Sequence, residues 1–232
     1  MKSLITTALL FSAMLCTAQR VIDVSKDEVN LNNYLQTAGS EPPGYTKFVS
    51  LKEGTPYFTD RWLKSSIVIS DGTTFKNVPA KLNLMQDQIH YLDAKGNEMI
   101  MTSPIKEIII ANDTKDSLFR FIPSAGVAPT AKKGWYLWQQ TGKASLYVLY
   151  DKELLEEKPY GSATVEQRIK TKKSYVIAYN NALFGFYKIK QVPSILANKK
   201  GQLEGFIQKQ SKDESEEERI VALIGYYNSL LK

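Results

Sequence analysis

The sequence predicts a mainly β protein with C-terminal helices, in which an antiparallel meander curls into an open barrel or sandwich and an amphipathic C-terminal helix covers it. Three observations support this fold class. Short apolar runs and turn signals alternate at nearly constant spacing over residues 66–122. Later runs at 135–138, 146–150 and 175–179 are apolar on both strand faces, so they need cover on both sides. After Pro193 the apolar period changes from two to about three and a half residues, as in helices.

Residues 1–18 show the pattern of a secretory signal peptide. Lys2 provides one positive charge, the run at 4–15 is apolar, and small residues precede Gln19. This run is too short to span a bilayer as a mature helix. We therefore expect cleavage after Ala18, a mature chain that begins at Gln19, and no transmembrane span. The protein is then exported, and is periplasmic, outer-membrane-associated or extracellular.

Cys16 is the only cysteine of the chain. A lipoprotein would carry its lipid on Cys16, but Leu15 before it is bulkier than acylation sites favour. Cleavage after Ala18 removes Cys16 and leaves no disulfide, no cysteine nucleophile and no thiolate metal site. We therefore expect no metal and no cofactor, and a core that is stable without disulfides.

The charge balance is mildly basic, with 30 Lys and Arg against 24 Asp and Glu and a formal net charge of +6. Positive and negative residues are interspersed, apart from a basic cluster at 170–173 and an acidic run at 214–218. This pattern is typical of a solvated surface, with weak attraction to anionic envelope polymers as the alternative. Nucleic acid is not expected as a partner, because an exported chain without a concentrated basic face does not suit it.

The domain organisation follows from composition. Residues 19–46 are polar with a Gly- and Pro-rich stretch, and predict an extended lead-in. A single β-rich domain is expected over 47–232, with a C-terminal helical segment at 193–232. After a first strand at 47–51 and a turn at 54–58, the expected strands are 66–70, 73–78, 80–85, 88–92, 98–102, 107–111 and 117–122.

Local signals define how the meander is built. Asp71 and Gly72 are a strong hairpin turn signal, and Pro79 is expected to interrupt the next strand. Residues 80–92 alternate between apolar and polar, which predicts one face toward the core and one toward water. His90, the only histidine, falls on the polar face and is expected to be exposed.

The second half of the chain continues the same sheet. A long loop is expected at 123–133, one helical turn at 151–157, a return to the sheet at 164–171 and a last strand at 184–189. Ser215 and Glu218 then form a capping-box pattern that begins the final helix. This helix has Glu217 on its expected solvated side and one apolar stripe, formed by Ile220, Leu223, Ile224, Tyr227, Leu230 and Leu231.

Four features together resemble an uncharacterised family of exported β-rich proteins common in Bacteroidota. They are the Ala18-Gln19 junction, the turn at 54–58, the run at 71–83 and the ending at 226–230. The resemblance covers about two thirds of the mature chain and rests on structural turns and a helix stripe. It implies an envelope location and a β-rich fold, but no activity and no catalytic residues.

Motifs for catalysis are weak. His90 as a general base would need a nucleophile, and no G-x-S-x-G turn is present. Four carboxylates could serve glycoside hydrolysis, but they crowd one short segment rather than face each other across a cleft: Asp151, Glu153, Glu156 and Glu157. Phosphate-loop, dinucleotide and calcium-loop patterns are absent from the sequence.

The most suggestive feature is a set of aromatic residues on the later strands. Tyr and Trp are enriched in surfaces that bind sugars and proteins. We select Tyr136, Trp138 and Tyr150 as candidate binding residues, and expect Tyr136 and Trp138 to be partly exposed. The alternative is that these side chains belong to the core, because their strands are apolar on both faces.

The leading functional hypothesis is a non-enzymatic binding or structural module of the cell envelope. Its partner would be another envelope protein, a glycan or an anionic envelope polymer. The alternatives are a hydrolase acting on envelope polymers and a carrier of a lipid-like ligand. If the protein is a hydrolase, we expect a concave pocket with two convergent titratable groups. A binding module should instead have an apolar or aromatic groove, and a carrier should have an empty apolar cavity inside the sheet.

The signal-peptide pattern predicts the mass of the mature protein. Intact-mass measurement after expression with export should give a chain that starts at Gln19 and carries no lipid. A mature mass that includes a lipid on Cys16 would contradict this and place the protein on a membrane surface.

Overall fold

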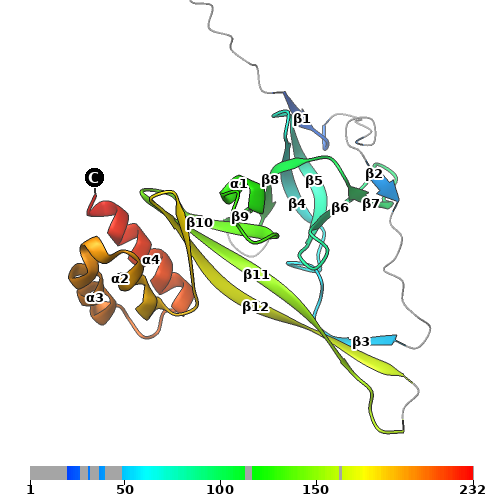
Figure 1. The fold of residues 1–232 in the computed structure, drawn as a ribbon. Helices are drawn as coiled ribbons and strands as arrows, with labels where there is room; N and C mark the ends of the chain where they lie inside the picture. Colours follow the sequence, from blue (N-terminus) through cyan, green and yellow to red (C-terminus); the bar gives the residue numbers. More distant parts are fainter. Residues whose placement is uncertain are drawn as a thin grey trace, which may run out of the picture.

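Among the described residues, thirteen strands form one large sheet. The helices after the last strand gather at one end of it, and the short helix Ser124–Val127 lies apart from them (Figure 1). The computed structural model describes residues 20–26, 31, 37–39, 49–112, 117–161 and 164–231. In this part of the chain the sheet is mixed and open, with β13 and β2 as its two end strands. The predicted class, mainly β with C-terminal helices, is confirmed. The predicted signal peptide at 1–18 lies outside the described residues.

The strands are joined by connections that vary in length. Their bounds are β1 Val21–Asp23, β2 Thr37–Gly39, β3 Val49–Glu53, β4 Leu63–Ile69, β5 Thr74–Asn83, β6 Gln88–Leu92, β7 Glu98–Met101, β8 Ile105–Ala111, β9 Leu118–Pro123, β10 Trp135–Gln140, β11 Ala144–Glu157, β12 Val165–Tyr179 and β13 Ala182–Phe186. The helices are α1 Ser124–Val127, α2 Val192–Ile195, α3 Lys200–Lys209 and α4 Glu216–Ser229, with 3₁₀ turns η2 Ile189–Gln191 and η3 Ala197–Lys199.

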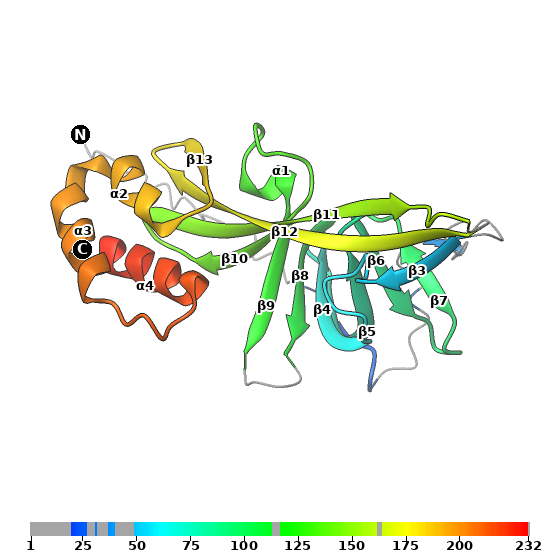
Figure 2. The same cartoon turned by 90° about the horizontal axis from the view of Figure 1, so that it is seen from below.

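The strand order departs from a simple meander at one point. Along the sheet the order is β13-β12-β11-β10-β9-β8-β4-β5-β6-β7-β2, so β8 returns to pair with β4 instead of β7. β1 joins β5 and β3 joins β12, both in parallel. Where the expected lead-in at 19–46 is described, it therefore contributes strands to the sheet. Figure 2 shows β4, β5, β8 and β9 running away from the long β11–β12 hairpin.

β5 runs unbroken through Pro79, so the expected interruption is wrong. Among the described residues Pro79 lies between Lys76, the last partner of β1, and Ala80, the first partner of β6. At that point β5 has a neighbour only on the β4 side, an edge-like position where proline is tolerated. Asn77 has φ 59° beside the shift in the β4–β5 register, which marks a β-bulge.

The expected helical turn at 151–157 is also wrong, because β11 stays extended to Glu157. Asp151 and Glu153 lie opposite Lys172 and Lys170 of β12. The Lys172 amine forms an ion pair with Glu153 at 2.6 Å. Pairing with a basic partner strand therefore outweighs the helical preference of the acidic segment. The last strand also ends earlier than expected, at Phe186, and α1 begins the expected loop at 123–133.

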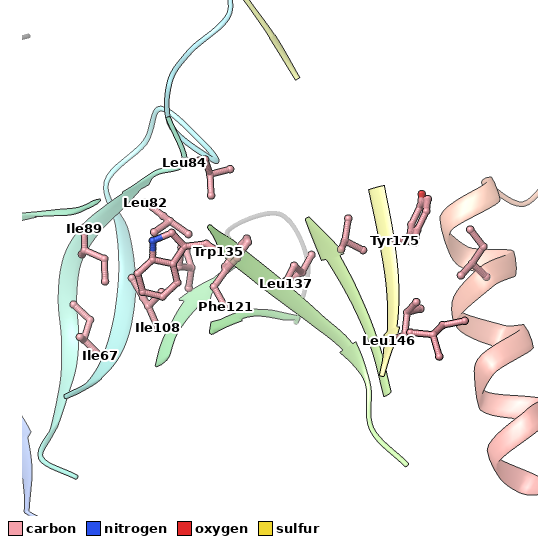
Figure 3. Close-up of a cluster of buried hydrophobic side chains, with 14 of the residues drawn as sticks. Ile67, Leu82, Leu84, Ile89, Ile108, Phe121, Trp135, Leu137, Leu146 and Tyr175 are labelled. Atoms are coloured by element: carbon pink, nitrogen blue, oxygen red, sulfur yellow. The ribbon is translucent and has the colours of Figure 1, made fainter. Parts of the chain in front are cut away.

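The main core lies on the inner face of the bent sheet and continues up to α4. Figure 3 follows it from Ile67, Leu82 and Ile108 through Phe121, Trp135 and Leu137 to Leu146 and Tyr175 beside the helix. A smaller cluster lies on the opposite face of β10 and β11 and contains Ile122, Tyr136, Tyr147 and Leu149. Burial on both faces explains why these strands are apolar throughout.

The final helix has the start and the apolar face that the sequence predicts. The Glu218 N–H donates to the Ser215 hydroxyl at 3.2 Å, and the Glu218 carboxylate accepts from the Ser215 N–H at 2.9 Å. Ile220, Leu223, Ile224 and Tyr227 are fully buried. Among the described residues, no helix is long and apolar enough to cross a membrane.

Docking of α4 predicts a large cost for truncating its buried face. Leu223→Ala should lower the free energy of unfolding by about 2–5 kcal/mol, because the side chain is fully enclosed. The matched control is Leu118→Ala, since Leu118 is 68% exposed and should change stability by less than about 0.5 kcal/mol. Chemical denaturation measures both variants. If a chain truncated before Ser215 unfolds at the same denaturant concentration as the full mature protein, α4 is not part of the core.

Candidate functional site

The three candidate residues predicted from sequence do not converge. Tyr136 and Trp138 face the smaller cluster on one side of the sheet. Tyr150 packs against the main core on the other side. Strand alternation explains the split, because Tyr136 lies opposite Leu149, and Tyr150 is the next residue along β11.

Tyr136 and Trp138 also have structural partners. Tyr136 is only 2% exposed, so the expectation of partial exposure is wrong for it, and its hydroxyl donates to the Lys132 carbonyl at 2.9 Å. Trp138 is half-buried, as expected, and its indole N–H donates to the Gln140 carbonyl at 3.1 Å. The Arg120 guanidinium lies 4.3 Å from the Trp138 ring centre. These contacts account for both side chains without a ligand.

A cleft of about 710 Å³ lies between the sheet and the first turn of α4. The sheet contributes side chains from β10 and β12, and the helix contributes its N-cap and the exposed part of its first two turns. The lining residues are Gln139, Lys173, Tyr175, Ser215, Glu216, Glu217, Glu218, Val221 and Ala222. The volume falls within the range of small-ligand sites, about 300–1,000 Å³.

Glu217 joins the helix to both strands at the centre of this cleft. One carboxylate oxygen accepts from the Gln139 amide at 2.8 Å, and the other accepts from the Lys173 amine at 2.8 Å. Its side chain is 24% exposed, so the expectation that Glu217 lies on the solvated side of the helix is wrong. Glu217 points toward the sheet, because the face of α4 that contacts the sheet includes polar residues beside the apolar stripe.

The two neighbouring carboxylates also hold the chain in place. Glu218 closes the capping box with Ser215. Glu216 accepts from the Ile189 N–H at 3.2 Å and from the Lys188 amine at 3.3 Å, which ties the helix start to η2. Carboxylates in the first turn of a helix are favoured by the exposed N–H groups there.

Tyr175 differs from these residues because its hydroxyl has no hydrogen-bond partner among the described residues. The side chain is 7% exposed, and its ring stacks on Phe186 with centres 5.4 Å apart. Burial raises the pKa of Tyr175 to about 12, and the charges of Glu217 and Glu216 add to this shift. The hydroxyl therefore stays protonated at neutral pH and is available as a donor beside the carboxylates.

Tyr150 lies next to the cleft but does not line it. The Lys173 amine is 5.2 Å from the Tyr150 ring centre, within cation–π distance. Burial raises the pKa of Tyr150, with smaller contributions from Glu217 and Tyr175. Tyr150 is thus in contact with Lys173 of the cleft but is not part of the cleft lining.

His90 is buried, which corrects the expectation of an exposed strand residue. Its Nδ1 lies 2.6 Å from a Glu98 carboxylate oxygen and 3.4 Å from the Tyr57 hydroxyl. The chain before β4 folds over this face of the sheet, because the Phe58 N–H donates to the Leu82 carbonyl at 2.8 Å. His90 Nε2 is enclosed and has no hydrogen-bond partner among the described residues. No described nucleophile is therefore hydrogen-bonded to this nitrogen.

The acidic segment of β11 does not form a catalytic pair. The Asp151 carboxylate pairs with Lys132 at 2.6 Å, and Glu156 accepts from the Gln167 amide at 2.6 Å. Successive residues point to opposite faces of the strand, so Glu156 lies on the other face from Asp151 and Glu153. Among the described residues, no three His, Asp or Glu side chains are grouped closely enough to hold a metal ion.

Comparisons with protein-family models, curated proteins and solved structures find no match to this chain. The cleft is therefore interpreted from its own geometry. Sequence reasoning missed Gln139, Lys173 and Glu217 because their meeting depends on how α4 docks. The available signal was the capping box, which shows that Glu217 lies in the first turn of a helix that must pack.

The bridging role of Glu217 is open to a stability test. Glu217→Ala should lower the free energy of unfolding by about 1–2 kcal/mol, because Gln139 and Lys173 lose a partly buried partner. Glu214→Ala, in the same acidic run but exposed, should cost less than about 0.5 kcal/mol. Equal denaturation midpoints for the two variants would show that Glu217 does not hold the helix to the sheet.

Proposed function

We propose that the protein is an exported, non-enzymatic binding module of the cell envelope and that the cleft at the start of α4 is its binding site. The observation that carries the proposal is the engagement of the three cleft carboxylates. Glu216, Glu217 and Glu218 are each held by partners that dock or cap the helix. The signal-peptide pattern and the resemblance to exported Bacteroidota proteins support the envelope location.

The number of titratable groups in the cleft would by itself favour an enzyme. Their arrangement argues against one. Glycoside hydrolases place two carboxylates on opposite sides of the scissile bond, about 5–9.5 Å apart. Here three consecutive residues on one helical turn supply the carboxylates, and the facing strands supply an amine, an amide and a phenol. The described lining residues therefore do not place one carboxylate as a general base opposite another as a general acid.

The inner face of the sheet also argues against a lipid carrier. Such a carrier needs an apolar cavity between the strands, and the described inner face is instead filled by packed side chains. Phe75, Phe121, Phe186 and Leu146 are all less than 2% exposed. The cleft at the edge of this core is a concave site that the described residues offer to a ligand.

A sedimentation assay with the native cell-envelope fraction tests the proposed function. The purified mature protein should sediment with the envelope in a saturable manner and leave the envelope polymers intact. Ala222→Trp places a large ring in the cleft and should reduce the bound fraction by about tenfold or more. Ala125→Trp is the matched control, because Ala125 is an exposed helical residue away from the cleft.

Two results would contradict the proposal. One is sedimentation that Ala222→Trp and Ala125→Trp leave equally unchanged, which would place binding elsewhere. The other is release of shortened polymer fragments, seen as new soluble reducing ends or peptides, which would favour the hydrolase alternative.

A further inference from the structure

We propose that the cleft takes a neutral, hydroxyl-rich ligand, a short segment of an envelope saccharide, and that the Tyr175 hydroxyl together with Gln139, Glu217 and Lys173 orients it. This inference rests on the proposed function and adds the chemical class of the ligand. It follows from the hydrogen-bonding groups, the charges and the apolar surface of the lining.

The hydroxyl of Tyr175 makes no hydrogen bond among the described residues. The Tyr175 side chain lines the cleft and is only 7% exposed. The hydroxyl is not among the fully enclosed polar atoms that lack a partner, so it is accessible from the cleft that the side chain lines. A ligand oxygen can therefore accept a hydrogen bond from it, and the group is a preformed donor for a ligand.

Hydrogen-bond donors and acceptors alternate along the cleft. Each Glu217 oxygen accepts one hydrogen bond, from Gln139 or from Lys173. A carboxylate has about four lone-pair sites, so it can accept from a ligand as well. Lys173 has three N–H groups, of which one is directed to Glu217, whereas the Ser215 hydroxyl is already engaged with Glu218 in the capping box. A sugar hydroxyl donates and accepts at the same time, and therefore fits a surface where both kinds of group alternate.

The charges that line the cleft favour an uncharged ligand. Three carboxylates and one lysine line the cleft, so an anionic polymer would be repelled. A cationic ligand would have to compete with Lys173, whose amine is already 2.8 Å from Glu217 and lies over the Tyr150 ring. An uncharged ligand is neither repelled by the carboxylates nor in competition with Lys173.

The size of the cleft and its apolar surface also suit a saccharide. Val221 and Ala222 lie on the helix side of the cleft and offer aliphatic contact to the C–H groups of a sugar ring. The Tyr175 ring is covered by Phe186, so recognition uses its hydroxyl and not its face. A cleft of about 710 Å³ suits a short oligosaccharide and is much larger than a single ion requires.

Titration of the mature protein with short oligosaccharides tests this inference. The probes are neutral trisaccharides (cellotriose, maltotriose, triacetylchitotriose), the acidic trigalacturonate, the cationic chitotriose, and neutral oligosaccharides released from the native envelope. We expect saturable binding of at least one neutral probe, followed by NMR chemical-shift changes, and weaker binding of both charged probes. Tyr175→Phe should weaken that binding about fivefold, as loss of one hydrogen bond predicts.

Tyr147→Phe is the matched control for this variant. Tyr147 is also 7% exposed and lies on the neighbouring strand, but it faces the opposite side of the sheet. It should leave the dissociation constant unchanged. Ala222→Trp, which fills the cleft, provides a second variant and should abolish saccharide binding without changing the fold measured by circular dichroism.

The outcomes separate this inference from the proposed function. If the protein sediments with the envelope through the cleft but binds no neutral probe, the saccharide assignment is wrong and the binding module stands. If a charged probe binds as well as the neutral ones, or if Tyr175→Phe and Tyr147→Phe bind alike, the assignment is also overturned. If saccharide binds but the envelope does not, the proposed envelope function fails.

Discussion

The packing of α4 on the inner face of the sheet is the contact on which the rest of the structure depends. Four fully buried residues of the helix cover strand residues that would otherwise face water, among them Leu146 and Tyr175. Polar contacts fix both ends of the helix. Near its end, the Asn228 amide donates to the Ala144 carbonyl and accepts from the Ala144 N–H, each at 2.9 Å. A Cβ on Gly142 would lie 2.5 Å from this amide, so the turn and the helix fit closely.

The cleft is a product of the same contact. Its lining comes from β10, β12 and the start of α4, so none of these elements forms it alone. Glu217 holds the walls together through Gln139 and Lys173, while the Tyr175 hydroxyl beside it stays without a partner in the described chain. Stability and the proposed binding thus depend on different groups of this cleft, because the carboxylates support the fold and no contact of the fold described here uses the Tyr175 hydroxyl.

Features with local signals could be predicted from the sequence, and features that depend on distant pairing could not. The turn at Asp71 and Gly72 and the capping box at Ser215 are both present, since a few adjacent residues determine them. The burial of His90 depends on a segment that folds over it from before β4. The separation of Tyr136 from Tyr150 depends on the β10–β11 register, which no single strand encodes.

The parallel pairing of β3 with β12 has a consequence for how the chain folds. Val49 lies opposite Val165, so this pair closes a loop that contains most of the sheet. Closing so long a loop is entropically costly, and contacts of this kind slow folding. The β11–β12 hairpin, by contrast, joins neighbouring segments with continuous register from Ala144 to Glu157. We therefore expect the hairpin to form early and β3 to attach to it late, so that this long-range pairing limits the speed of folding more than local propensity does.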